Sequence, residues 1–365
     1  MTEATVPPAI RQALLQQADW LLYDLMPQRQ EALWIQLGAA DLRQASFLDQ
    51  RVLPAAANKI RTPLALLQSA TSDQPLRWIF HCGHVASTLL SRLLDAPPGR
   101  VLREPQVLRT TAAMVQESNW PWAQYSPAAC ADWLAAVCRL LSKTTDAGDG
   151  VLIKATSSTT NLMPLITQQR SHDRAVALAA PLDLYLAVML RSEGGRHDVN
   201  GFIQQRMQQF CGWLEGAPSL PLHQFSEAQK LALSWLVSLW PMAQAVNANP
   251  DRCRWLDFAT LMEHTEVAVA DVRTMLDWSG AVASDAELAR YAKDPAQPFD
   301  SASRWRQLSQ LRQQQAAQAE TLYDWLAKLC QPLPAIQQWL QATRQCASME
   351  QLNTGAQSGA AAISP

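Results

Sequence analysis

The stretch LRWIFHCGHVASTLLSRLLD, residues 76–95, decides the fold class of this chain. Residues 76–81 are apolar and aromatic over the length of a short buried strand, and Gly83 then supplies a turn. The helical spacing of apolar residues resumes from Ser87 to Leu94. A strand, a glycine turn and a helix in this order aim backbone N–H groups at one point, which suits a phosphate or sulfate group.

Four further apolar segments with strand character follow along the chain, and helical patterns separate them. These segments are residues 100–105, 151–154, 174–180 and 254–258. Such an alternation predicts an α/β fold, in which a mostly parallel sheet of about five strands is flanked by helices.

Both ends of the chain are predicted to lie outside this sheet. Apolar residues recur with a helical period over residues 9–26, a Gln-rich helical pattern covers 303–328, and Ala, Ser and Gly dominate the last residues. We therefore expect a helical N-terminal extension (1–74), an α/β domain (75–300), C-terminal helices that pack on it (301–346) and a disordered tail (347–365).

The composition excludes several classes of protein. With 365 residues and 48% apolar content, the chain is neither disordered nor fibrous. Its net charge of 30 − 32 = −2 provides no field that would attract nucleic acid or membrane surfaces, so neither is expected as a partner. Seven cysteines without a CxxC pair indicate free thiols in a reducing compartment. Since no signal peptide or membrane span is recognised, we expect a soluble, cytoplasmic protein.

The loop after residue 81 departs from the Walker A pattern of ATP- and GTP-binding proteins, because no Lys precedes Ser87 and Thr88. Its letters Gly83-His-Val-Ala-Ser-Thr-Leu-Leu90 instead resemble the phosphosulfate-binding loop of the P-loop sulfotransferase superfamily. Four later segments resemble that family in the same order: VLREPQVLR (101–109), VLIKATS (151–157), RWLDFATLM (254–262) and YAKDPAQPFDSASRW (291–305).

This resemblance implies a sulfotransferase that takes a sulfuryl group from 3′-phosphoadenosine 5′-phosphosulfate, needs no metal, and delivers the group to a hydroxyl or amine acceptor. It implies donor contacts from the loop residues Gly83, His84, Val85, Ala86, Ser87, Thr88 and Leu89. His84 stands where family members carry Lys or Arg, so we also assign it a catalytic role.

Two further catalytic residues are nominated at the carboxyl ends of predicted strands, where open α/β sheets place their ligands. Glu104 is the candidate general base for the acceptor, and Lys154 would stabilise the leaving phosphate or the sulfuryl oxygens. The family holds the 3′-phosphate of the donor with an Arg and a Ser, at whose positions this chain has Ala179 and Ala187. Arg191, Arg196 and Lys293 are the nominated substitutes.

Other readings remain open. Residues 83–88 could form a tight turn with Ser87 as N-cap, and Cys82 is either a reactive thiol or a buried free cysteine. A nucleotide- and Mg²⁺-dependent phosphotransferase would need Asp257 as its acidic residue, whereas a scaffold that lost its donor site would need no catalytic residue. The helix at 303–328 is either an exposed amphipathic helix or a homodimer surface. The acceptor, a small molecule or a peptide, cannot be read from the sequence.

Overall fold

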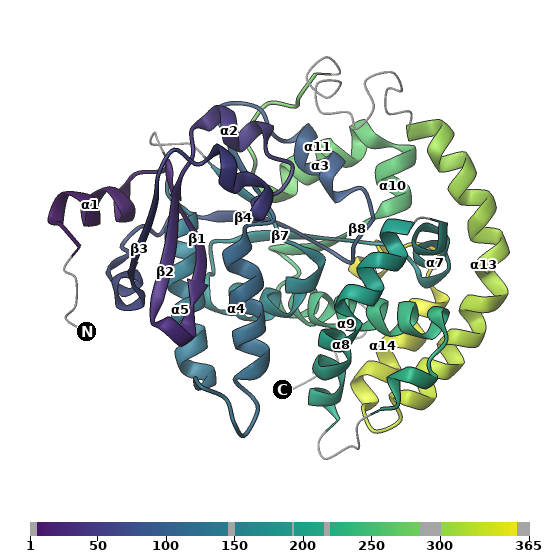
Figure 1. Cartoon of the computed structure of the whole chain (residues 1–365). Helices are drawn as coiled ribbons and strands as arrows, with labels where there is room; N and C mark the ends of the chain where they lie inside the picture. The colour runs from purple at the N-terminus through teal and green to yellow at the C-terminus, as the bar shows by residue number, and fades with distance from the viewer. Residues whose placement is uncertain (1–5, 145–149, 192, 215–219, 285–300, 356–365) are drawn as a thin grey trace. The chain divides into compact units, whose positions relative to one another are not determined.

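The α/β prediction is confirmed by a computed structural model, which describes residues 6–144, 150–191, 193–214, 220–284 and 301–355. Its five-stranded sheet has the strand order β5-β6-β4-β7-β8 (Figure 1). The strands are β4 (Leu76–His81), β5 (Arg100–Arg103), β6 (Val151–Lys154), β7 (Arg174–Ala179) and β8 (Cys253–Asp257). All five coincide with the predicted segments to within one or two residues.

Three of these strands are parallel with a defined register. Leu76 to Ile79 of β4 pair with Val151 to Lys154 of β6, and Arg100 to Arg103 of β5 pair with the same residues on the other side. Every residue of β6 is buried, as expected for a central strand that is covered on both faces. Lys154 therefore ends the central strand of the three, between Ile79 and Arg103.

The prediction of a helical extension over residues 1–74 is wrong in its secondary structure. Helix α1 covers only Pro8–Gln16, and a three-stranded antiparallel sheet follows, with β1 (Trp20–Met26), β2 (Glu31–Gln36) and β3 (Lys59–Pro63). Residues 20–23 are all buried, so β1 shows no alternation of polar and apolar residues. The run therefore fitted a helical period equally well.

The chain divides into two compact units, the first of which comprises residues 1–80, 88–175 and 271–298. Helices α4 and α5 lie side by side in it and pack against β1 (Figure 1). Its helices are α1, α2 (Ala39–Gln44), α3 (Ser87–Leu93, which begins in the second unit), α4 (Gln106–Glu117), α5 (Pro127–Leu141) and α6 (Met163–Gln169). The buried Asp173 carboxylate fixes the start of β4, because it accepts from the Leu76 N–H at 3.0 Å and the Trp78 indole at 2.9 Å.

The second unit comprises residues 81–87, 176–270 and 299–365. The long helix α13, drawn in yellow-green, runs along α7 (Figure 1). Its helices are α7 (Leu182–Arg191), α8 (Glu193–Trp213), α9 (Glu227–Ala248), α10 (Phe258–Glu263), α13 (Ser301–Leu329), α14 (Pro334–Gln345) and α15 (Gln351–Gly355), while α11 (Thr265–Leu276) continues into the first unit. Among the helices in the described ranges, none has the length and apolar character needed to cross a bilayer.

The prediction of a disordered tail from residue 347 is also wrong as far as residue 355. Met349 is fully buried, and its N–H donates to the Asp257 carboxylate at 2.7 Å. Asn353 binds both the N–H and the C=O of Trp255, at 2.9 and 3.0 Å. Specific contacts with β8 thus order a segment whose composition alone suggested disorder. Residues 356–365 lie outside the described residues.

Candidate functional site

The loop that follows β4 has an unusual backbone. Gly83, His84 and Ala86 have φ values of 95°, 56° and 57°, and the last two carry a Cβ in a region that favours glycine. The Gly83 N–H donates to Nδ1 of His81 at 3.0 Å. The first N–H groups of α3 have no partner within the helix, as in any α-helix. Backbone strain is therefore concentrated in the stretch that the sequence nominates for an anion.

The side chains of this loop differ in exposure. His84 is exposed, whereas Val85 and Ser87 are buried, and Ala86, Thr88 and Leu89 are half-buried. Cys82 is fully buried, and burial raises the pKa of its thiol to about 12. A thiol with this pKa is protonated at neutral pH, so Cys82 is the buried free cysteine and not the reactive one.

Glu104 and Lys154, the nominated base and cation, lie together in the first unit. The Glu104 N–H donates to the Lys154 carbonyl at 2.7 Å, and the Lys154 ammonium donates to Oε1 of the Glu104 carboxylate. Lys154 is 1% exposed and Glu104 is 8% exposed. Burial lowers the pKa of Lys154, and the Glu104 carboxylate partly offsets this effect. The pair is thus an ion pair held between neighbouring strand ends.

Three further residues surround this pair, of which sequence reasoning considers Arg109 as a plain ion-pair partner of Glu104 and misses Thr156 and Phe47. Arg109 of α4 donates to Oε2 of Glu104 at 3.3 Å and to the Thr156 hydroxyl at 3.4 Å. The Phe47 ring lies 5.5 Å from the Lys154 ammonium. Arg109 and Thr156 fall within the segments 101–109 and 151–157, but nothing in the sequence near residue 47 indicated a contact with residue 154.

Phe47 reaches the pair because the backbone of its neighbour Leu48 is hydrogen-bonded at the end of β5. The Leu48 N–H donates to the Arg103 carbonyl at 2.7 Å, and the Gln106 N–H donates to the Leu48 carbonyl at 3.1 Å. Glu104, between them, has a φ of 52° although it precedes Pro105, which favours an extended backbone. Contacts on both sides therefore hold Glu104 in a strained conformation.

Of the nominated substitutes for the 3′-phosphate ligands, Arg191 and Arg196 lie on α7 and α8 of the second unit. Arg191 is exposed and donates to Oε1 of Gln307 at 2.7 Å, and Arg196 is exposed on α8. Lys293 lies outside the described residues. Ala179 and Ala187 are 0% and 3% exposed. The two family positions are therefore occupied by interior methyl groups.

Asp257, the nominated Mg²⁺ ligand, is fully buried and caps α10. One oxygen of its carboxylate accepts from the Ala259 N–H and the other from the Met349 N–H, both at 2.7 Å. Burial raises the pKa of this carboxyl to about 6. Within the described ranges, no three His, Cys, Asp or Glu side chains are grouped as a metal ion requires. Asp257 thus holds backbone in place.

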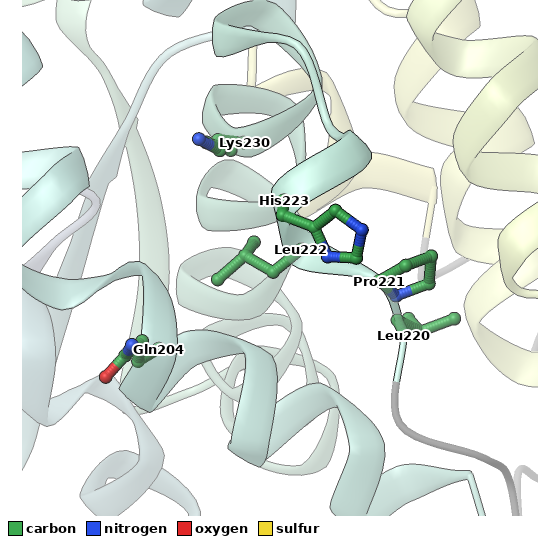
Figure 2. A pocket seen from close by; sticks show the side chains of 6 residues that line it. All are labelled: Gln204, Leu220, Pro221, Leu222, His223 and Lys230. Carbon is green, nitrogen blue, oxygen red and sulfur yellow. The ribbon is translucent and has the colours of Figure 1, made fainter.

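The second unit also contains a shallow pocket lined by Gln204 of α8, Lys230 of α9 and the residues 220–223 between them. Figure 2 shows that the polar ends of Gln204, His223 and Lys230 point in different directions. A ligand site needs polar groups that converge on one point, and this pocket lacks that arrangement.

Comparison with solved structures gives only a distant likeness. No protein-family model and no curated protein matches the sequence. A solved structure, the sulfotransferase domain from the curacin biosynthetic pathway, matches 64% of this chain and 83% of its own length, with 13% sequence identity and a TM-score of 0.32. A likeness of this size carries no argument about activity, and the α/β assignment rests on the strands themselves.

Proposed function

We propose that the chain is a sulfotransferase-like enzyme, which transfers a sulfuryl group from 3′-phosphoadenosine 5′-phosphosulfate to a hydroxyl or amine. The observation that carries this proposal is the buried Glu104–Lys154 pair at the carboxyl ends of two neighbouring parallel strands. Open α/β sheets place their reacting groups at this edge. A proton acceptor and a cation side by side are what transfer of a charged group to a hydroxyl requires.

The donor end of the proposal rests on the loop after β4. This loop directly follows the last residue of β4, His81. The backbone amides of residues 84–88 and the hydroxyls of Ser87 and Thr88 would hold the phosphosulfate of the donor. The exposed His84 would add a positive charge when protonated.

In sulfuryl transfer, each of these residues would have one role. The acceptor oxygen forms a bond to sulfur while the bond from sulfur to the bridging phosphate oxygen breaks, and Glu104 takes the acceptor's proton. Lys154 and Arg109 would stabilise the negative charge on the sulfuryl and leaving-group oxygens. Since both cations now bind Glu104, the acceptor hydroxyl has to replace one of these contacts before Glu104 can act.

A non-catalytic scaffold is the second candidate, and one observation favours it. The buried methyl groups of Ala179 and Ala187 take the positions of the family's 3′-phosphate ligands. A chain that no longer binds the donor does not need the arginine and serine that hold the 3′-phosphate. The phosphotransferase has no comparable support, because both oxygens of Asp257 accept from backbone N–H groups.

Binding tests the donor site first. The purified chain is titrated calorimetrically with adenosine 3′,5′-bisphosphate and, in parallel, with ATP and Mg²⁺. Micromolar binding of the bisphosphate that is lost in the Ser87→Ala/Thr88→Ala double variant supports the sulfotransferase. Binding of ATP alone would favour the phosphotransferase, and no binding of either to a folded chain would favour the scaffold.

Catalysis is tested by single turnover with ³⁵S-labelled donor and a panel of hydroxyl and amine acceptors. We expect Glu104→Gln to lower the transfer rate by about 10²- to 10⁴-fold, the usual contribution of a general base, with unchanged affinity for the bisphosphate. Glu117→Gln, at the exposed end of α4, is the matched control. Equal rates in the two variants would remove Glu104 from the mechanism.

A further inference from the structure

A buried arginine of the second unit has more hydrogen-bond donors than acceptors around it. Arg206 of α8 is 3% exposed, and its Nη2 lies 3.4 Å from Oδ2 of Asp198. Among the described residues, no atom accepts a hydrogen bond from its Nε or Nη1. The guanidinium also lies 5.7 Å from the Phe202 ring, which offers a π-face but no lone pair in the ring plane. Two nitrogen atoms of the charged guanidinium, which together carry three N–H groups, are thus buried without an acceptor among the described residues.

A second polar group of this kind lies nearby. Tyr185 of α7 is fully buried, and its hydroxyl has no hydrogen-bond partner within the described part of the chain. Helices α7 and α8 pack against each other. Burial raises the pKa of Tyr185, and the positive charge of Arg206 acts in the opposite direction, so the guanidinium is within electrostatic reach of the hydroxyl.

The same guanidinium also acts on the loop after β4. Burial raises the pKa of the Cys82 thiol, and the Arg206 charge is among the groups that lower it. Cys82 directly precedes Gly83, where the strained loop backbone begins. Within the second unit, the Arg206 charge therefore acts both on Tyr185 of the packed helix α7 and on the residue before the loop.

Buried donors without acceptors are costly, and the cost is highest for a charged group. A water molecule would accept one or two of these hydrogen bonds but would not neutralise the charge of Arg206. Only the long contact with the Asp198 carboxylate would then balance that charge. An oxyanion does both, because it neutralises the guanidinium and accepts from several N–H and O–H donors at once.

We propose that Arg206 and Tyr185 form a binding site for a phosphate or sulfate group beside the start of the loop after β4. Arg206 supplies the charge and the N–H donors of Nε and Nη1, and Tyr185 supplies one O–H donor. The further assignment of this site to the 3′-phosphate of the donor nucleotide rests on the proposed function. The two residues would then provide the cation and the hydroxyl that Ala179 and Ala187 lack, with Tyr185 only two positions before Ala187.

Inorganic anions test the site independently of any nucleotide. The melting temperature of the full chain is measured in chloride buffer and then with phosphate or sulfate at the same ionic strength. We expect both anions to raise the melting temperature of the unaltered chain and of Arg306→Met, which replaces an exposed arginine on α13 of the same unit. We expect a smaller rise in Tyr185→Phe and none in Arg206→Met.

Tyr185→Phe keeps the experiment decisive if Arg206→Met does not fold, because it removes only one oxygen that has no partner. A second readout separates binding from structure. A residue that merely supports the fold would lower the melting temperature in chloride when it is replaced. Arg206→Met should keep or raise that temperature, since it removes an unsatisfied buried cation.

Nucleotides identify the source of the anion. We expect the unaltered chain to bind adenosine 3′,5′-bisphosphate about 10- to 100-fold more tightly than adenosine 5′-monophosphate, and Arg206→Met to lose this preference. Anion stabilisation without nucleotide binding keeps this site and removes the sulfotransferase. Nucleotide binding without a preference, together with anion effects that survive both substitutions, overturns this site and leaves the sulfotransferase standing.

Discussion

Glu104 and Lys154 are joined twice, once through the backbone and once through their side chains. The Glu104 N–H donates to the Lys154 carbonyl, and the Lys154 ammonium donates to the Glu104 carboxylate. The first bond extends the β5–β6 pairing by one residue beyond Arg103, where Glu104 turns into a left-handed conformation. The sheet therefore fixes the backbone of the pair, and the side chains bind each other in a place that water scarcely reaches.

This arrangement predicts strongly non-additive stability effects. Glu104→Ala leaves the Lys154 ammonium buried with no carboxylate, and we expect it to lower the free energy of unfolding by about 3–5 kcal/mol. In the Glu104→Gln/Lys154→Met double variant, most of that loss should be recovered, since neither charge is then buried. Urea unfolding of the single and double variants measures this coupling. Losses that simply add would show that the two side chains do not depend on each other.

A second buried amine makes stability depend on pH. Lys143, two residues after the end of α5, donates to the Leu14 carbonyl of α1 at 2.7 Å and to the Trp20 carbonyl of β1, and so ties these two elements to the end of α5. Burial lowers the pKa of Lys143 from 10.5 to about 7. The Arg100 charge contributes to this lowering, and the Asp19 carboxylate partly opposes it.

The direction of the effect follows from proton counting. Between pH 7 and pH 10.5 the unfolded chain binds more protons at Lys143 than the folded chain, so this residue adds stability as the pH rises. The gain is at most about 1.4 kcal/mol per pH unit and disappears as the pH falls through 7. We expect urea unfolding at pH 7 and pH 9 to show a smaller pH dependence in Lys143→Met than in the unaltered chain. Equal slopes would contradict this assignment.

The strands that were predicted correctly share one property. Residues 76–81 and 151–154 are short apolar runs bounded by glycine or proline, and they are buried on both faces. Such runs are too short for helices, so length decides the assignment. The run at residues 18–26 follows a helical pattern without a break in composition, and only its hairpin partner at 31–36 identifies it as a strand.

The candidate site was predictable only in part, for a similar reason. Glu104 and Lys154 could be placed together because parallel strands end at the same edge, which is a rule of topology. Phe47 contacts Lys154 because the Leu48 backbone is hydrogen-bonded at the end of β5, and no local sequence pattern predicts this contact. Arg206 did leave a signal, because it interrupts the helical apolar stripe formed by Val199, Ile203 and Phe210.

The burial of the cysteines predicts the order in which their thiols react with an alkylating reagent. Cys82 and Cys138 are fully buried, and burial raises the pKa of both thiols to about 12. Cys211 and Cys346 are only half-buried. Limited treatment of the native chain with iodoacetamide at pH 7.5, followed by peptide mass spectrometry, should therefore modify Cys211 and Cys346 first. Early modification of Cys82 would mean that the loop after β4 opens in solution, and a urea-unfolded sample in which all thiols react is the control.

The ordered C-terminal segment should contribute measurably to stability. The Asn353 side chain accepts from the Trp255 N–H and donates to the Trp255 carbonyl, and it therefore satisfies two backbone groups of β8. Asn353→Ala leaves both without their partner, which should cost about 1–3 kcal/mol of unfolding free energy. Asn353→Asp should not rescue the loss, because a carboxylate cannot donate to the Trp255 carbonyl. Urea unfolding of both variants, with the exposed Asn200→Ala as control, measures these differences. If Asn353→Ala is as stable as the control, the segment after Gln345 does not hold β8.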